Sequence, residues 1–325
     1  MISLKLKHLG LPYLGSKRRL ASEIVDIMLS RHLNARYLYD LFGGGGAISL
    51  EAIQRPQFDK VIYNDKNTGI VEVLKDILYN GISRKYYQWV DRKTFEEHKY
   101  DNDWFGGLLQ VVWSFNNNQQ AYQYGRKIES LKYLLHQIIV YRDIEALREL
   151  HYKYRLYITM PRSDPSLDWR EQITQRRIRV SREITQIEKD IKPEPLAQTG
   201  RKRFNNIEHL ERIDRIRKIY QLPTIYKEKL IIYNRSYDEV EINTPPEETV
   251  IYLDPPYVNK HYQIGIDKNE LLKWIKHMSQ KGYPIYVSEY EFDGLECVWE
   301  RLKTNRYSRS KRKVYERLFS NHNLL

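Results

Sequence analysis

The chain has 325 residues and a net charge of +12, with 54 Lys and Arg against 42 Asp and Glu. No run of 18 or more apolar residues and no apolar signal segment occur, so we expect neither a membrane span nor a secretory leader. The single cysteine, Cys297, excludes an internal disulfide and is expected to serve packing, and no Cys/His cluster suggests a metal site. A cytoplasmic protein with a polyanionic partner fits this composition best.

The amino-terminal part of the chain has the pattern of a parallel βαβ unit. Its expected elements are, in order, a loop with the sequence Tyr13-Leu14-Gly15-Ser16-Lys17, a helix at about 20–29, a strand at 37–42, a glycine turn at 43–46, a helix at about 47–54 and a strand at 61–64.

The glycine turn and the acid that follows it predict a nucleoside-binding corner. Glycines between a strand and a helix let backbone approach a ligand, and Asp65, after the next strand, can accept hydrogen bonds from ribose hydroxyls. The phosphate fingerprint is incomplete because Ile48 stands where the third glycine would fall, and no P-loop occurs. An adenosine cofactor without a pyrophosphate therefore fits better than NAD or ATP, and S-adenosylmethionine is the obvious choice.

Residues 81–224 differ in character from their surroundings. Apolar residues at helical spacing predict one helix through Ile173 to Ile191 and another through Ile207 to Ile216. This segment holds 27 Lys and Arg against 19 Asp and Glu, a net +8, which leaves +4 for the rest of the chain. This segment is therefore a better candidate than the rest of the chain for binding an anion.

Alternation of strands and helices resumes after this segment. We expect strands at 230–233, 250–253 and 285–288, and a helix at about 269–280 that begins with a capping pair, Asp267 and Glu270. The chain is therefore predicted to be an α/β protein with a mainly parallel sheet flanked by helices, interrupted by a mainly helical insertion.

The tetrapeptide Asp254-Pro255-Pro256-Tyr257 closes the apolar strand that ends at Leu253. Each proline fixes φ and removes a backbone donor, so the turn is rigid and the carbonyls of Asp254 and Pro255 are left as acceptors. With the flat ring of Tyr257 beside them, these acceptors can receive an amino group on a planar ring. An ordinary turn at the end of a strand is the competing interpretation.

Taken together, these motifs resemble those of the Dam-like DNA N6-adenine methyltransferases. The resemblance is colinear over most of the chain outside the insertion and extends to Val287-Ser288 and to the segment from Glu316 to Asn321. It implies a Rossmann-like methyltransferase fold formed by residues 1–80 and 225–325, with residues 81–224 as an inserted target-recognition domain. It also implies S-adenosylmethionine as cofactor and double-stranded DNA as partner, without an obligate protein partner.

The resemblance assigns roles to residues that match the family's motifs. Cofactor contacts are implied for Tyr13, Gly15, Lys17, Asp40, Phe42, Gly43, Gly45, Asp65 and Asp254. Asp254, Pro255, Pro256 and Tyr257 match the catalytic tetrapeptide. One position departs: the family often has an acidic residue followed by Phe where this chain has Ser236-Tyr237, with Asp238 next. Whether Asp238 or Ser236 replaces that contact stays open.

In the expected mechanism, the Asp254 side chain and the Pro255 carbonyl accept the two N6 hydrogens of an extruded adenine, and Tyr257 stacks on the base. Three basic clusters are candidates for DNA contacts, against the alternative of a solvated face: Arg176, Arg177 and Arg179; Arg201, Lys202 and Arg203; Lys311, Arg312 and Lys313. A methylase of cytosine N4 or of RNA adenine, and a catalytically silent nucleic-acid-binding protein, remain as alternatives. A role in restriction–modification and a recognition sequence are not determined by these patterns.

Overall fold

The computed structural model describes residues 5–190, 206–256, 266–307 and 310–324, and for residues 190, 303–307 and 310–314 it describes the backbone alone. Tyr257 and the cluster from Arg201 to Arg203 lie outside the described residues, as do the side chains of Lys311, Arg312 and Lys313.

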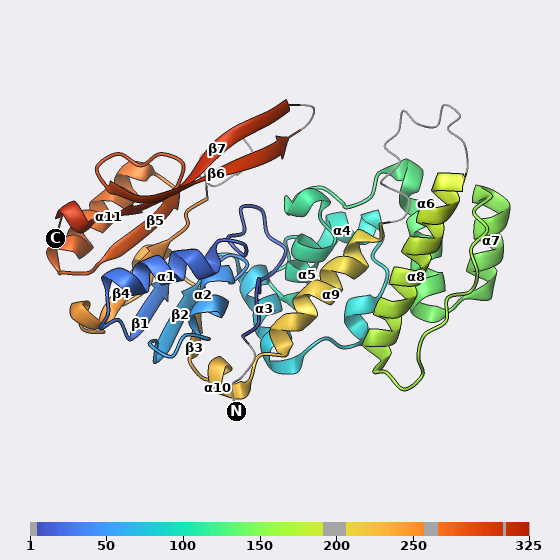
Figure 1. Cartoon of the computed structure of the whole chain (residues 1–325), viewed down its shortest axis with the longest axis horizontal. Helices are drawn as coiled ribbons and strands as arrows, with labels where there is room; N and C mark the ends of the chain where they lie inside the picture. Colours follow the sequence, from blue (N-terminus) through green and yellow to red (C-terminus); the bar gives the residue numbers. More distant parts are fainter. Residues whose placement is uncertain (1–4, 191–205, 257–265, 308–309, 325) are drawn as a thin grey trace.

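A seven-stranded, mostly parallel sheet forms one end of the molecule (Figure 1). Its strands lie in the order β3-β2-β1-β4-β5-β7-β6. In chain order they are β1 (Tyr37–Asp40), β2 (Lys60–Asn64), β3 (Leu230–Tyr233), β4 (Thr249–Leu253), β5 (Ile285–Glu289), β6 (Glu296–Tyr307) and β7 (Ser310–Ser320). The first five pair in parallel, and β7 runs antiparallel to both β5 and β6.

Side chains alternate between the two faces of the sheet, which buries the central strands on both sides. In β4, Val250 and Tyr252 enter the larger core, and Ile251 and Leu253 enter a second core that includes Leu271 of α11. This explains why β4 reads as a continuous apolar run in the sequence. The parallel βαβ unit and the α/β class predicted from the sequence are confirmed.

Helices cover the sheet and continue beyond it (Figure 1). They are α1 (Ala21–Arg31), α2 (Ala47–Ala52), α3 (Thr68–Asn80), α4 (Arg92–His98), α5 (Trp104–Val112), α6 (Arg126–His136), α7 (Ile144–Tyr154), α8 (Trp169–Asp190), α9 (Glu208–Tyr220), α10 (Thr224–Lys227) and α11 (Lys268–Gln280). As predicted, Asp267 caps α11, accepting a hydrogen bond from the amide of Asn269. No helix within the described ranges combines the length and apolar character needed to cross a membrane.

Between α3 and β3 the described residues form helices but no strand of the sheet. Helix α3 packs against α5 and α9, and the apolar side chains of these helices belong to the same core as one face of the sheet. Because that core is continuous, the helical segment is held firmly beside the carboxyl ends of the strands. Whether residues 81–224 constitute a separate target-recognition domain stays a prediction.

Strands β6 and β7 form a hairpin that extends well past the sheet (Figure 1). Only Arg317 to Ser320 of β7 pair with β5, and the rest of the ribbon pairs with itself. The sequence analysis did not predict these strands, because basic residues interrupt their alternation of apolar and polar side chains. Cys297 at the root of the hairpin is exposed, so the expectation that it serves packing is wrong.

Candidate active site

A cavity of about 1210 Å³ opens at the carboxyl ends of the parallel strands. It lies where the strand order reverses, between β1 and β4, which is where open α/β sheets bind ligands. Gly43 and Asp65 line it from one side and Asp254 from the other. The glycine turn and the turn formed by Asp254, Pro255 and Pro256, called here the proline corner, therefore share one cavity. The following cofactor candidates also line it: Tyr13, Gly15, Lys17, Asp40, Phe42 and Gly45.

The turn requires glycines because neighbouring parts of the protein pack directly against its backbone. A Cβ on Gly43 would lie 2.2 Å from the ring of Tyr63, and one on Gly45 would lie 2.8 Å from the carbonyl oxygen of Leu11. The Leu11 amide in turn donates to the Gly45 carbonyl at 2.7 Å. The absence of side chains thus lets β2 and the amino-terminal segment hold the turn, which fixes its backbone at the cavity wall.

Asp65 secures the same turn from the end of β2. The amide of Gly44 donates to Oδ2 of Asp65 at 2.7 Å, and the amide of Asn67 donates to Oδ1 at 2.8 Å. Burial raises the pKa of Asp65, and these two backbone donors partly oppose that shift. The carboxylate therefore shapes the turn, and its predicted ribose contact would use the remaining lone pairs of the same oxygens.

Asp40 presents a buried carboxylate with unused acceptor capacity. Its Oδ2 accepts from the hydroxyl of Ser49 at 2.7 Å, whereas Oδ1 has no hydrogen-bond partner among the described residues. Burial raises the pKa of Asp40 to about 7, and Asp254 and Asp65 add to this while Ser49 opposes it. A buried acceptor without a partner is costly, and a cationic ligand in the cavity would satisfy it.

Lys17 joins the proline corner to the root of the β6–β7 hairpin. Its Nζ lies 2.7 Å from Oδ1 of Asp254 and 3.5 Å from Oε1 of Glu316. Burial disfavours the ammonium, but Asp254, Tyr252 and Glu316 outweigh that effect, so the pKa of Lys17 stays above its usual value. The group is thus a buried cation held between two carboxylates that lie far apart in the sequence.

The proline corner itself follows β4 directly. Pro255 is buried and Pro256 half-buried, and both line the cavity beside Asp254. Tyr252 of β4, two residues before Asp254, shares a hydrogen bond of 2.6 Å with the hydroxyl of Ser288. Burial, together with the charge of Asp254, raises the pKa of Tyr252. The corner is therefore anchored to β5 as well as to Lys17.

Phe42 and Tyr237 form an aromatic side of the cavity, and Tyr237 belongs to the segment where the sequence departs from the family pattern. Phe42 and Tyr237 lie with ring centroids 5.1 Å apart, and Tyr237 meets Trp274 edge-on at 5.6 Å. Ser236 forms a capping box with Glu239, whereas Asp238 lines the cavity and takes no part in that capping box. Of the two candidates left open by the sequence, Ser236 thus uses its hydroxyl in the helix cap, whereas the Asp238 carboxylate does not take part in it.

The helical segment also contributes to the cavity, which the sequence analysis missed. Phe115 and Asn116 line it from the turn after α5, where Asn116, Asn117 and Gln119 have positive φ. Gln110 of α5 accepts from the side-chain amide of Asn67 at 2.8 Å, which links this wall to the start of α3. The run of amide side chains at 116–120 was the available signal, because such residues tolerate left-handed backbone at a binding edge.

The three arginines of the first candidate DNA cluster, Arg176, Arg177 and Arg179, differ in burial and in their partners. Arg176 is buried and donates to the carbonyl of Val140 at 3.3 Å, and Arg177 forms an ion pair of 3.0 Å with Asp214. Arg179 is exposed on the same helix, α8. Arg176 and Arg177 thus have structural partners inside the helical segment, and their predicted contact with DNA stays untested.

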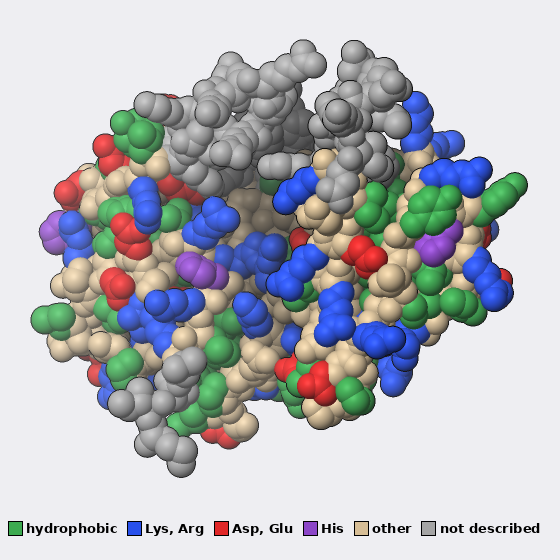
Figure 2. All heavy atoms as spheres, turned by 45° about the vertical axis from the view of Figure 1, so that its right-hand side comes forward, with side chains coloured by type: hydrophobic (Ala, Val, Ile, Leu, Met, Phe, Trp, Pro, Cys, Tyr) green, Lys and Arg blue, Asp and Glu red, His purple; other side chains and the backbone are tan. Residues whose placement is uncertain are grey.

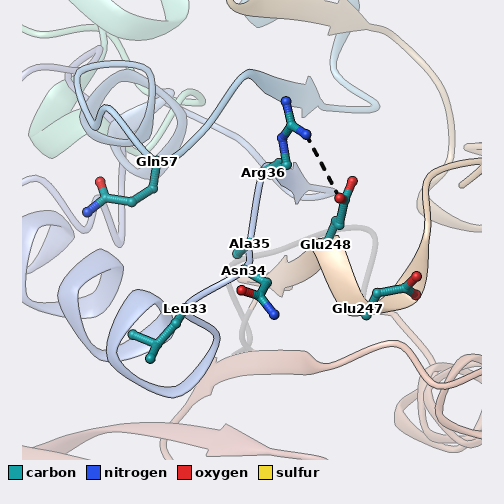
Figure 3. Close-up of a pocket in the computed structure, with 7 residues that line it drawn as sticks. All are labelled: Leu33, Asn34, Ala35, Arg36, Gln57, Glu247 and Glu248. Carbon is teal, nitrogen blue, oxygen red and sulfur yellow. Dashed lines mark ion pairs between the residues drawn. The ribbon is translucent and has the colours of Figure 1, made fainter.

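A second, smaller pocket of about 320 Å³ lies at the opposite edge of the sheet (Figure 3). Residues that precede β1 and β4 line it, and Figure 3 shows Arg36 directed toward Glu248, 3.9 Å away. Its position at the amino ends of the strands separates it from every predicted site residue. Within the described ranges, no group of three or more His, Cys, Asp or Glu residues could hold a metal ion.

Comparison with known families agrees with this site. The seven-stranded, mostly parallel sheet with its cavity at the switch point is consistent with a methyltransferase fold. Residues 13–166 match the family model of the D12 class N6 adenine-specific DNA methyltransferases, which confirms the family recognised from the motifs over that range. The match includes the motif at Tyr13 to Lys17, the glycine turn and Asp65, and it ends before Asp254. A search of curated proteins gives no match.

Proposed function

We propose that this chain is a site-specific DNA adenine-N6 methyltransferase that takes its methyl group from S-adenosylmethionine and acts on an adenine extruded from duplex DNA. The observation that carries the proposal is the single cavity into which the glycine turn and the corner at Asp254 both open. The family indicates the reaction class, and the cofactor, the extruded base and the duplex substrate go beyond it.

The residues of the cavity suit this cofactor. Asp40 offers a buried carboxylate oxygen without a partner among the described residues, as a cationic ligand requires. Phe42 and Tyr237 offer apolar faces for a purine, and Asp238 beside them can accept from its amino group. The cavity of about 1210 Å³ exceeds the usual size of a small-molecule site, roughly 300–1,000 Å³, and so leaves room for a base beside the cofactor. When bound, S-adenosylmethionine supplies an electrophilic methyl group on a sulfonium.

The proline corner orients the nucleophile. Adenine N6 is a weak nucleophile because its lone pair is delocalised into the ring. The Asp254 carboxylate and the Pro255 carbonyl would accept its two hydrogens, which favours a pyramidal nitrogen with the lone pair directed at the methyl group. Lys17 holds the carboxylate of Asp254 in place at 2.7 Å. Positioning and electrostatics then supply most of the rate enhancement, without a covalent intermediate.

The proposal also assigns roles to the two parts of the chain, to Tyr257 and to the basic clusters. Residues 1–80 and 225–325 would form the catalytic domain, and residues 81–224 the target-recognition domain. Tyr257 would stack on the extruded adenine. The candidate DNA contacts remain the three basic clusters: Arg176, Arg177 and Arg179; Arg201, Lys202 and Arg203; Lys311, Arg312 and Lys313.

The experiment that tests the proposal has two parts. Isothermal calorimetry with S-adenosylmethionine should show one site per chain, and DNA incubated with protein and cofactor should contain N6-methyladenine. Single-molecule sequencing of DNA from cells that express the protein then gives the modified base and its context. N4-methylcytosine as the product, or methylation of RNA alone, would replace the proposed activity, and cofactor binding without any methylated product would favour a silent binding protein.

A further inference from the structure

Four arginines form a patch, called here the arginine patch, between the amino-terminal loop and helix α9. Arg18 and Arg19 directly follow Lys17, and Arg212 and Arg215 lie three residues apart on α9, so they occupy one side of that helix. Arg19 and Arg215 are exposed, and Arg18 is half-buried with its side chain packed against the position of Gly10. Two segments far apart in the sequence thus bring four like charges together.

Neighbouring carboxylates offset this charge at Arg212 alone among the four described arginines, since Glu208 and Glu211 oppose the lowering of its pKa by burial. In the part of the chain that the structure describes, Arg18, Arg19 and Arg215 form no ion pair with Asp or Glu. Burial and the charges of Arg215, Arg19 and Arg212 lower the pKa of Arg18 to about 10. By contrast, Arg177 on α8 is fully engaged by Glu211 and Asp214. Arg18, Arg19 and Arg215 therefore keep a positive field at this place.

The arginine patch adjoins the cavity on two sides. On one side, Arg18 follows Lys17, whose ammonium contacts Asp254 at 2.7 Å. On the other, Arg212 donates to the carbonyls of Val112 and Ser114 at 2.8 and 2.6 Å, and Phe115, the next residue, lines the cavity. Figure 2 shows Lys and Arg side chains gathered beside a hollow of the molecular surface.

We infer that the arginine patch binds the phosphate backbone of duplex DNA next to the adenine that enters the cavity. Planar guanidinium groups suit bidentate contacts with phosphate oxygens, and a phosphate would neutralise the mutual repulsion of the patch. Exposed Arg19 and Arg215 would make the contacts, while Arg212 anchors the turn before Phe115. This inference rests on the proposed function and adds the surface that holds the substrate, which none of the three sequence-predicted basic clusters includes.

The test compares Arg19→Gln, Arg215→Gln and their combination with wild-type protein on a short duplex, at several salt concentrations. Each phosphate contact contributes about 0.9 to the slope of log affinity against log salt, so each variant should lower that slope by about 1 and the pair by about 2. Cofactor affinity should not change. The control is Arg36→Gln, which removes the same charge at the opposite edge of the sheet (Figure 3) and should keep the wild-type slope.

Thermal melting separates a binding patch from a structural one. Because the variants relieve repulsion between like charges, the double variant should melt at or above the wild-type temperature in low salt. A slope equal to that of Arg36→Gln, or a clear loss of melting temperature, would overturn the inference. A wild-type protein that makes no N6-methyladenine would refute the proposed function instead, and the salt slope would still decide whether the patch binds DNA.

Discussion

Two carboxylates and one lysine determine the chemistry of the corner at Asp254. Lys17 bridges Asp254 and Glu316, and its side chain and that of Glu316 are almost fully buried. A buried ion that loses one partner leaves an uncompensated charge, which is costly. The geometry of Asp254 therefore depends on Glu316, a residue that need not touch either substrate.

We predict that Glu316→Gln lowers kcat of methyl transfer without weakening cofactor binding. The amide keeps the size of the side chain but removes the charge that helps hold Lys17, and a misplaced catalytic group costs up to about 10²-fold in rate. The matched control is Glu300→Gln on β6, where an exposed carboxylate pairs with Arg317 at 3.2 Å. Unchanged kcat in Glu316→Gln would show that Glu316 does not position the corner.

Asp40 should make cofactor binding dependent on pH. Its pKa of about 7 means that the carboxylate loses its charge as the pH falls below neutrality. A cationic ligand then loses its partner, so the Kd for S-adenosylmethionine should rise by up to about tenfold per pH unit below 7. Calorimetry between pH 6 and 8 would measure this on wild type and on Asp40→Asn, which should bind weakly with no such pH dependence.

Asp40 should also make the stability of the fold depend on pH. Its contribution to stability should fall as the pH rises, whereas cofactor affinity should increase. The folded protein holds the Asp40 proton more tightly than the unfolded chain, whose pKa is near 3.8, so this group lowers stability as the pH rises from about 4 to about 7. Asp40→Asn removes that loss and should raise the melting temperature at pH 8. A lower melting temperature would indicate that the charge of Asp40 stabilises the fold.

Among the structural elements, the glycine turn should tolerate substitution poorly. Gly43→Ala would force a Cβ to within 2.2 Å of the Tyr63 ring, whose hydroxyl also donates to the Gly44 carbonyl at 2.7 Å. Overpacking of this kind costs about 1–3 kcal/mol, which denaturant unfolding would measure. Gly125→Ala is the control, because its Cβ would meet nothing within 4 Å. Equal stability of the two variants would contradict the packing described for the turn.

Elements with a single clear period were predictable from the sequence, and contacts between distant segments were not. The strands that end at Asp40, Asn64 and Leu253 follow from apolar runs bounded by turn residues, and their parallel order brings the acids to one edge. The ion pair of Lys17 with Glu316 joins residues from opposite ends of the chain, which no local pattern encodes. The arginine patch likewise depends on the packing of α9 beside the amino-terminal loop.

At the scale of the whole molecule, the proposed function requires that the target base leave the duplex before it enters the cavity. Extrusion costs a few kcal/mol for a paired base and less for a mispaired one. Once sequencing has identified the target adenine, a duplex in which that adenine is mispaired should therefore bind more tightly than the matched duplex. Equal affinities, measured by fluorescence anisotropy, would count against extrusion of the target base.

The most direct test of the central claim, that the proline corner and the glycine turn form one site for methyl transfer, is a methylation assay of Asp254→Ala. The account predicts that this variant transfers no detectable methyl group to DNA, while its affinity for DNA stays close to that of the wild type. An Asp254→Ala protein that still makes N6-methyladenine at the wild-type rate would contradict the claim.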